Sequence, residues 1–337
     1  MKDSELIISG TLGNDDPSDP VEAGADSELR QLLFGVAQHG LRLDQALVEL
    51  VPEFSRSYLQ QLIDLGGVTV NAGVVSKAST RIKATDVGTI ELRPTPQSQA
   101  FKPEPMALDV VHQDEHLLVI NKPAGLVVHP APGNWSGTLL NGLLAFDTKA
   151  MNLPRAGIVH RLDKDTSGLM VVARTRAVMD ALVLLIAAHE VKRQYIALAH
   201  GRWLGAGKRE VSAPIGRDPR NRLRMAVVDL DKNSGKPART DIEFLQNCDQ
   251  ACLVRCTLHT GRTHQIRVHM ASIAHPLVAD SLYGGHAAGG MQRQALHAYR
   301  LAFKHPLTQQ SLDFHATLPQ DLVQVLNRWG LSYNDFQ

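Results

Sequence analysis

Two aspartates, Asp163 and Asp165, stand two residues apart in the segment GIVHRLDKDTSGLMVVART, residues 157–175. Arg161 and Lys164 lie beside them, shortly before an apolar run. This pattern is typical of a turn, in which aspartate side chains accept local hydrogen bonds. A catalytic carboxylate that neighbouring cations keep ionised would also explain it, although the turn is the commoner case. The segment by itself leaves both interpretations open.

A paired-carboxylate glycosidase is a third interpretation of the two aspartates. Side chains two residues apart on an extended chain share one face at about 7 Å, a spacing that would suit an inverting pair. The rest of the chain gives no sign of a sugar-binding cleft, and aromatic residues make up only 5% of it. We therefore disfavour this interpretation.

The cysteines form the other candidate cluster, at Cys248, Cys252 and Cys256. Three residues separate each neighbouring pair, which matches no common zinc spacing. The surrounding sequence indicates a strand, a turn and a strand, so we expect small buried side chains and no metal. We also find no Walker A loop and no G-x-G-x-x-G that opens a helix, and no cofactor is predicted.

The charge and hydropathy patterns limit the classes of protein that this chain could be. Residues 1–40 contain 2 basic and 8 acidic residues, whereas residues 95–337 contain 27 basic and 20 acidic ones. A positive region of this size permits a polyanionic partner. We find no secretory signal pattern and no run of about 18 apolar residues. Three cysteines fit a reducing compartment, so we expect a cytoplasmic protein that does not contact a membrane.

Several elements must position these residues, and they fall into five segments. Residues 1–28 read as a disordered acidic tail, because they are rich in Asp, Ser, Gly and Pro. Residues 41–92 read as a small α/β unit, with helices in LRLDQALVEL and SRSYLQQLIDLG and a hairpin in VTVNAGVVS. The proline-rich residues 93–105 read as a linker, residues 106–327 as the main domain, and residues 328–337 as a C-terminal tail.

The main domain contains more predicted strands than helices. Strands are predicted in a hairpin over ALDVVHQDEHLLVINKP and in GLVVHP, LMVVART, RQYIALAHGRW, TDIEFLQ, CLVRCTLHT and HQIRVHM. Helices are predicted in SGTLLNGLLAF, RAVMDALVLLIAAHEV and QDLVQVLNRWG. Neighbouring strands of this kind favour an α+β fold with a largely antiparallel sheet over a doubly wound α/β fold.

The small unit resembles the S4 RNA-binding domain over RLDQAL, SRSYLQQLI and VTVN. One departure is the turn Asn71-Ala72-Gly73, where the family usually has adjacent Asn and Gly. The basic residues Arg42, Arg56, Lys77, Arg81 and Lys83 could form either a face for phosphates or an ordinary solvated surface. The resemblance favours RNA contact, with Arg42, Arg56, Lys77 and Arg81 as the candidates.

The segment HRLDKDTSGLMVVART, residues 160–175, resembles the second motif of the RluA family of RNA pseudouridine synthases. Further matching segments follow the family order: NKPAGLVVHP, VKRQYIALAHG, HTGRTHQIRVHM, DSLYGG and ALHA. An S4 domain before such a catalytic domain is also the expected order. The resemblance implies the pseudouridine synthase fold, with a central mixed, largely antiparallel sheet and flanking helices.

The resemblance also implies a reaction, the isomerisation of uridine in RNA. The N1–C1′ bond breaks, the bound uracil turns, and C5 bonds to C1′, without redox change or cofactor. It assigns the reacting carboxylate to Asp163, its stabilising cation to Arg267 and a stacking tyrosine near C5 to Tyr195. Leu296 would pack on the other face of the base, and Arg161 would fill the gap that the flipped uridine leaves. Asp165 keeps the turn role.

Other basic residues are predicted to hold the RNA substrate. Lys122 and Arg262 are expected near the target nucleotide, and Arg220 and Arg222, in the basic segment GRDPRNRLRM, are expected on the backbone. The chain departs from the family pattern at His189, Arg193 and Ala279, none of which is an assigned catalytic position.

The expected partner is large-subunit ribosomal RNA or a pre-ribosomal particle, bound by a monomer. Two alternatives stay open. One is an RNA-binding assembly factor with a silent catalytic domain; retention of Asp163, Tyr195 and Arg267 together argues against it. The other is a nucleosidase that hydrolyses the glycosidic bond; the S4-like unit and the expected exclusion of water argue against that.

Overall fold

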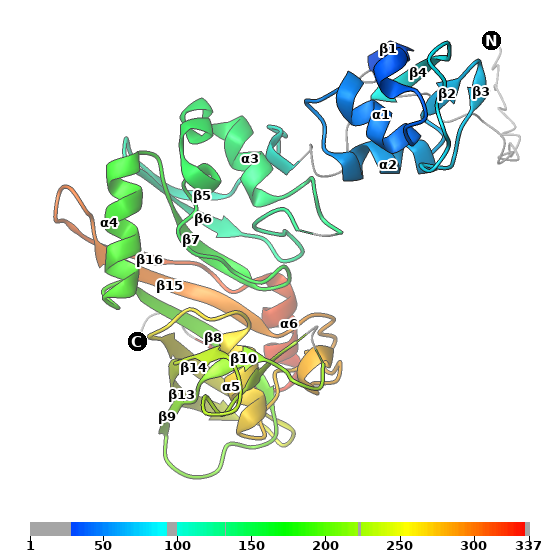
Figure 1. Ribbon diagram of the computed structural model, residues 1–337. Helices are drawn as coiled ribbons and strands as arrows, with labels where there is room; N and C mark the ends of the chain where they lie inside the picture. Colours follow the sequence, from blue (N-terminus) through cyan, green and yellow to red (C-terminus); the bar gives the residue numbers. More distant parts are fainter. Residues whose placement is uncertain (1–27, 93–99, 132, 222–223, 334–337) are drawn as a thin grey trace, which may run out of the picture. The chain divides into compact units, whose positions relative to one another are not determined.

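The computed structural model describes residues 28–92, 100–131, 133–221 and 224–333. Its backbone forms two compact units that divide between Gln97 and Ser98. Each unit builds its own apolar core. Figure 1 shows the helices and strands of both units.

The first unit packs two helices on a four-stranded antiparallel sheet with the order β1-β4-β2-β3. Ser55 caps α2 by accepting a hydrogen bond from the Tyr58 N–H at 3.3 Å. Strand β1 was not predicted, and it begins at Glu28, the last residue of the segment predicted as a tail. The elements are β1 (Glu28–Leu33), η1 (Val36–Gln38), α1 (Leu43–Leu50), α2 (Arg56–Asp64), β2 (Val68–Val70), β3 (Gly73–Val74) and β4 (Val87–Leu92).

The β2–β3 hairpin turns on Asn71 and Ala72, which both have positive φ angles, 49° and 64°. A two-residue loop with this geometry is the type I′ turn that matches the twist of a hairpin. The Asn71 side chain donates to Asp86 at 2.8 Å and accepts from the Val87 N–H at 3.1 Å. These bonds hold the turn although alanine occupies the position where the S4 family usually has glycine.

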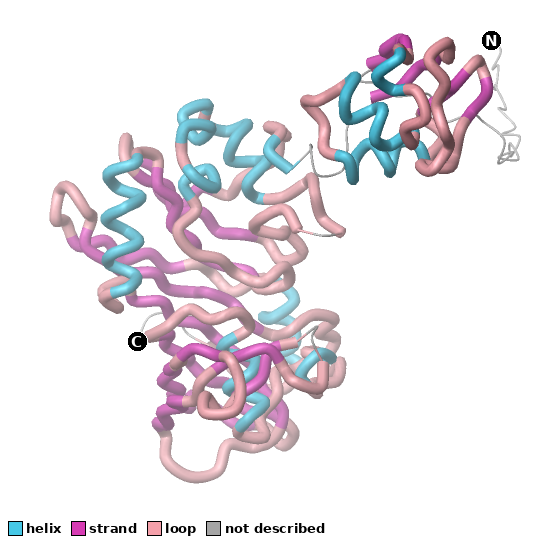
Figure 2. The backbone as a smooth tube through the Cα atoms, viewed as in Figure 1, coloured by secondary structure: helices cyan, strands magenta, loops and turns pink. Residues whose placement is uncertain are grey.

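The second unit is built on a nine-stranded sheet with the order β5-β6-β7-β15-β8-β14-β13-β9, to which β16 adds by pairing with β15 (Figure 2). All of these pairs are antiparallel except β7 with β15, so the sheet is mixed and the predicted fold class is confirmed. Its strands are β5 (Val110–Gln113), β6 (Leu117–Lys122), β7 (Ser167–Ala173), β8 (Lys192–His200), β9 (Lys208–Ser212), β13 (Arg239–Asn247), β14 (Ala251–Leu258), β15 (Leu296–Lys304) and β16 (Ser311–His315).

Helices cover both faces of this sheet. Alternate strand residues point to opposite faces, and both faces carry buried apolar side chains. One face packs with α3 and α5, and its side chains include Tyr195 and Leu296. The other face packs with α4 and α6. A small second sheet orders its strands β11-β10-β12. The remaining elements are α3 (Leu139–Phe146), η3 (Thr148–Asn152), η4 (Pro154–Gly157), α4 (Arg176–Ala187), β10 (Ile215–Arg217), β11 (Met225–Val227), β12 (Gly235–Lys236), α5 (Gln265–Ser272), η5 (Ser281–Tyr283) and α6 (Gln320–Arg328).

Two predicted strands of the second unit are absent. HQIRVHM forms helix α5, and GLVVHP, residues 125–130, forms an irregular segment. The carbonyls of Val127 and Val128 accept hydrogen bonds from Leu139 and Leu140 at the start of α3. Those two N–H groups have no partner inside the helix, so the segment caps α3 and does not pair in the sheet.

The segment after α6 begins the predicted C-terminal tail, residues 328–337, and its first residues are packed. Leu331 is 3% exposed, and the Leu331 N–H donates to the Leu326 carbonyl at 2.9 Å. Leu331 packs in the same apolar cluster as α6. Residues 329–331 therefore finish the core on this face of the sheet.

Candidate active site

Asp163 lies in the turn that leads into β7. The Thr166 N–H donates to the Asp163 carbonyl at 3.2 Å, which closes the turn. The Asp163 side chain is 18% exposed, so it is largely shielded but still reachable from the cavity beside it. Its neighbour Asp165 takes part in the turn through its backbone, and its carbonyl accepts a hydrogen bond from Arg293.

Gly168 fixes the position of this turn against β15. Its φ angle is +115°, and a Cβ atom built on it would lie 2.2 Å from the Ala298 carbonyl oxygen. Only glycine allows this approach. The short parallel pairing of β7 with β15 at Ser167 and Gly168 thus depends on Gly168, the second residue of the strand that follows the Asp163 turn.

Arg267 places its guanidinium between Asp163 and Asp280. Its Nη1 lies 3.2 Å from Asp163 Oδ2, while Nε and Nη2 donate to the two Asp280 oxygens at 2.7 and 2.8 Å. Asp280 is 2% exposed and Arg267 is 7% exposed. The two carboxylates hold the Arg267 pKa above its usual value although burial opposes this. A bidentate contact of this kind fixes the plane of the guanidinium that faces Asp163.

His264 and Tyr283 complete the surroundings of Asp163. The Tyr283 hydroxyl accepts the Met225 N–H at 3.0 Å and lies 2.8 Å from His264 Nδ1, so we assign its own hydrogen to that nitrogen. His264 then carries its proton on Nε2, which faces Asp163 Oδ1 at 3.9 Å. Burial lowers the His264 pKa, and Asp163 opposes this effect. Arg267 also stacks over the Tyr283 ring at 5.0 Å.

Tyr195 and Leu296 lie on neighbouring strands and point to the same face of the sheet. Tyr195 pairs with Ala298 in the β8–β15 register, and Leu296 pairs with Ala197. Both side chains line the cavity beside Asp163, together with Leu162, Thr166 and Ile266. Burial raises the pKa of Tyr195 to about 12, so its phenol is neutral. The result is a slot with an apolar and aromatic wall beside a carboxylate.

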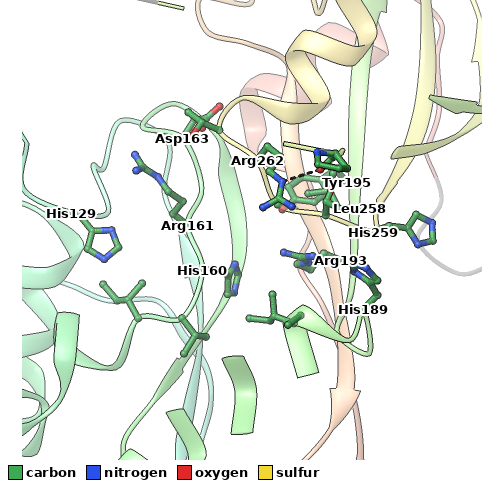
Figure 3. A pocket seen from close by; sticks show the side chains of 18 of the residues that line it. His129, His160, Arg161, Asp163, His189, Arg193, Tyr195, Leu258, His259 and Arg262 are labelled. Atoms are coloured by element: carbon green, nitrogen blue, oxygen red, sulfur yellow. Dashed lines mark hydrogen bonds between the residues drawn. The ribbon is translucent and has the colours of Figure 1, made fainter. Parts of the chain in front are cut away.

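A larger cavity of about 670 Å³ adjoins this slot (Figure 3). One wall carries His129, His160, Arg161 and Asp163, and the facing wall carries Arg193, Tyr195, Leu258 and Arg262. Arg161 and Arg262 both line the two cavities. Arg161 is exposed, whereas Arg262 is half-buried and its Nε donates to the Pro237 carbonyl. The structure thus brings together Asp163, Arg267, Tyr195, Leu296, Arg161 and Arg262 of the predicted site.

Lys122 is the exception in the catalytic unit, because its side chain does not reach the cavity. It is 1% exposed, and its ammonium donates to the carbonyls of Pro123, Leu126 and Lys164 at 2.8–2.9 Å. Burial lowers its pKa to about 8, which Asp163 and Asp165 oppose. The predicted contact with substrate is therefore wrong, and Lys122 instead ties the Asp163 turn to the segment after β6.

The predicted RNA contacts outside the cavity have different surroundings. Arg42 and Arg56 both pair with Asp44, which is fully buried, while their own side chains are 38% and 50% exposed. The two arginines lower the Asp44 pKa despite its burial. Lys77, Arg81 and Arg220 are exposed, and Arg222 lies outside the described residues.

Asp280, His264 and Tyr283 are functional neighbours of Asp163 to which sequence analysis gave no role. Asp280 and Tyr283 belong to DSLYGG, and His264 belongs to HTGRTHQIRVHM, both of which match family segments. The family match therefore carried a signal, but the residues by themselves gave no reason to join segments so far apart. Within the described part of the chain, no group of three or more His, Cys, Asp or Glu side chains could hold a metal ion.

Comparison with family models gives two matches. Residues 116–272 match the RNA pseudouridylate synthase model, and residues 41–87 match the S4 domain model. In the residues that the structure describes, no helix is long and apolar enough to cross a membrane.

Curated relatives match over most of the chain. A protein of Neisseria meningitidis serogroup B named ribosomal large subunit pseudouridine synthase D is 46% identical over 323 residues, which cover 93% of this chain and 85% of the relative. A protein of the same name from Yersinia pestis is 42% identical, over 89% of this chain and 94% of the relative. Among solved structures, human RNA pseudouridylate synthase domain containing 4 is 25% identical, with a TM-score of 0.53 over 67% of this chain and 94% of that one.

Proposed function

The chain belongs to the RNA pseudouridine synthases, and from this premise we propose that it isomerises specific uridines of large-subunit ribosomal RNA and so contributes to ribosome biogenesis. The curated relatives carry the name of ribosomal large subunit enzymes, and an S4 domain precedes the catalytic domain. We further propose that it works in the cytoplasm as a monomer. We also propose that it needs no redox cofactor, because the isomerisation changes no oxidation state.

One observation carries the mechanism: the Asp163 carboxylate lines a slot with an apolar wall and is contacted by a guanidinium that Asp280 holds in place. A uridine flipped out of its stack would enter this slot, with Tyr195 and Leu296 against the uracil. Arg161, exposed beside Asp163, would occupy the space that the base leaves and offset part of the flipping cost of a few kcal/mol.

Asp163 then acts at the ribose. Cleavage of the N1–C1′ bond develops positive character on the sugar, which a carboxylate stabilises either by adding to C1′ or by removing a sugar proton. The released uracil turns while it stays in the slot, C5 bonds to C1′, and the C5 hydrogen is lost as N1 gains one. Both routes use the carboxylate form of Asp163, whose Oδ2 lies 3.2 Å from Arg267 Nη1.

The RNA-binding roles divide between the two units. We propose that residues 41–92 hold RNA with Arg42, Arg56, Lys77 and Arg81, and that residues 106–327 carry out the chemistry. Asp44 orients the first two arginines, which keep 38% and 50% of their side chains exposed for phosphate contact. Arg220 and Arg222 are proposed to contact the RNA backbone.

Mapping of pseudouridine in ribosomal RNA tests this function. Carbodiimide-stop primer extension would compare cells that contain the wild-type protein, no protein or the Asp163→Asn variant. We expect the deletion strain to lose specific stops and the wild-type gene to restore them, whereas Asp163→Asn does not. If the deletion strain keeps every stop, the ribosomal substrate is wrong. If Asp163→Asn restores them fully, the assignment of the carboxylate is wrong.

A further inference from the structure

Arg193 is a buried cation for which the site described so far has no use. It lies on β8 two residues before Tyr195, so both side chains point to the same face about 7 Å apart. The residue is only 5% exposed. Among the residues that the structure describes, its guanidinium has no hydrogen bond or ion pair, and its Nε is fully buried without a partner.

The cavity around Arg193 is rich in other cationic or basic side chains. Figure 3 shows Arg193 on the same wall as Tyr195 and Arg262, across from His160. Of the described residues that line this cavity, only Asp163 is acidic, and Arg267 contacts it. The basic lining residues are Arg155, Arg161, Arg193, Arg262, His129, His160, His189 and His259.

A second buried polar atom without a partner opens on the same cavity. His129 Nε2 has no hydrogen bond within the described part of the chain. Burial, together with Arg161 and Arg155, lowers the His129 pKa to about 4, so the ring is neutral at physiological pH. Neutral His129 would add a hydrogen-bonding group to the cavity without adding charge.

An arginine without a partner is costly to bury. Guanidinium remains charged in proteins, and a buried charge is stable only when it is paired and hydrogen-bonded. Burial lowers the Arg193 pKa from its usual value, and Tyr195 alone opposes this effect. The cost is compensated if the partner arrives with the substrate. An anion with several acceptor oxygens, such as a phosphodiester, matches the planar donors of arginine.

We propose that Arg193 is the anchor of a phosphate site, where it binds the non-bridging oxygens of an RNA backbone phosphate next to the flipped uridine. The position two residues from Tyr195 places this contact beside the base slot. The site would fix the strand while the base turns, which is a positioning role and not a part in the bond exchange. This inference rests on the proposed function, since RNA supplies the phosphate.

The first experiment compares Arg193→Met and Arg193→Lys with the wild type on a ribosomal RNA fragment that contains a mapped target uridine. Loss of a charge-assisted hydrogen bond should raise KM about tenfold or more for Arg193→Met, with a smaller change in kcat. Arg193→Lys should recover part of the loss, because it keeps a point charge without the fork. The free Arg193→Met protein should melt no lower than the wild type, because it loses an unpaired buried charge.

A matched control is Arg202→Gln, which removes an exposed arginine beyond the opposite end of β8, paired with Asp249. Its KM and melting temperature should equal those of the wild type. A structural role for Arg193 would give the reverse pattern, a clearly lower melting temperature for Arg193→Met with unchanged KM. That pattern, or an unchanged KM at wild-type stability, would overturn the phosphate site.

The second experiment locates the phosphate. Single methylphosphonate linkages, which lack one anionic oxygen, would be placed in turn on both sides of the target uridine. At the contacted linkage, the methylphosphonate should weaken binding by the wild-type protein about as much as the Arg193→Met substitution weakens binding of unmodified RNA. The same methylphosphonate should weaken binding by the Arg193→Met protein little further. Additive losses at every linkage would contradict the contact. Conversion of uridine by the wild type is scored in parallel, so that failure of the proposed function is distinguished from failure of this site.

Discussion

At the residue scale, the cation that contacts the Asp163 carboxylate is far from it in sequence and is not one of its neighbours along the chain. Arg161 and Lys164 flank Asp163 along the chain, yet the contacting cation is Arg267, 104 residues away. Arg267 is itself fixed by Asp280, so the geometry of the carboxylate depends on a second carboxylate that does not face the base slot.

The Asp280→Asn variant tests this dependence. Asparagine keeps one acceptor oxygen but loses the charge and one of the two hydrogen bonds to Arg267. We expect kcat to fall about tenfold or more, with a smaller change in KM, because Asp280 does not line the base slot. Steady-state kinetics on the same RNA fragment measures both constants.

Asp313→Asn is the control for this variant. Asp313, on β16, also pairs with an arginine, Arg300 on β15. The control substitution should leave kcat unchanged. A wild-type kcat in Asp280→Asn would show that Arg267 supports catalysis by Asp163 without being held by the Asp280 carboxylate.

At the element scale, α5 shows where reasoning from sequence fails and why. Ile266, Val268 and Met270 alternate with polar residues, which is the period of a strand. The segment is nonetheless a helix, and residues 265–270 are all buried. Its polar members are hydrogen-bonded inside the protein: Gln265 and His269 to Thr240, and Arg267 to two carboxylates. Burial on all sides removes the one-sided stripe by which a helix is recognised.

Local patterns predicted the helices α3, α4 and α6 and the strands β5, β6, β7, β8, β13 and β14, but not the strands β9, β15 and β16 of the large sheet. The contacts that build the site could not be derived in this way. Asp163, Arg267 and Tyr195 were assigned from the family resemblance, whereas Asp280 and the burial of Lys122 depend on tertiary packing. Lys122 looked like a free cation because nothing local shows that three carbonyls surround its ammonium.

The β7–β15 junction gives a prediction about pH. His297 on β15 is 1% exposed and lies 2.9 Å from Ser167 Oγ through its Nδ1. Burial lowers its pKa to about 4. The unfolded chain therefore binds a proton at His297 near pH 6.5, and the folded chain binds it only near pH 4, so folded stability falls as pH drops across this window.

We expect a loss of about 3 kcal/mol of unfolding free energy from His297 over the whole window. The difference in unfolding free energy between the wild type and His297→Gln should narrow by that amount from pH 7 to pH 4. Urea unfolding followed by tryptophan fluorescence measures it, because all three tryptophans belong to the second unit. Parallel pH curves for the two proteins would contradict the assignment.

At the scale of the whole molecule, the total charge is nearly neutral although basic side chains gather in both units. The formal net charge is only +1, so affinity for RNA cannot come from overall attraction and must come from local basic surfaces. The first unit offers Lys77 and Arg81 as exposed cations, and the second offers the basic cavity beside Asp163.

A Lys77→Gln, Arg81→Gln double variant tests the contribution of the first unit. Loss of two phosphate contacts should reduce the slope of log affinity against log salt by about 2 and weaken binding uniformly. Because these residues lie in the other unit, kcat at saturating RNA should stay at the wild-type value. Filter binding over a salt series gives the slope, with Arg202→Gln as the control. An unchanged slope would remove this pair from the RNA-binding surface.

The central claim is that Asp163 performs the bond exchange while other groups hold the RNA. Release of tritium from RNA labelled at uracil C5 measures that exchange directly, since the C5 hydrogen leaves when C5 bonds to C1′. With equal amounts of RNA bound, the wild-type protein should release tritium, and Asp163→Asn should release none above background. Release by Asp163→Asn at the wild-type rate would contradict the account.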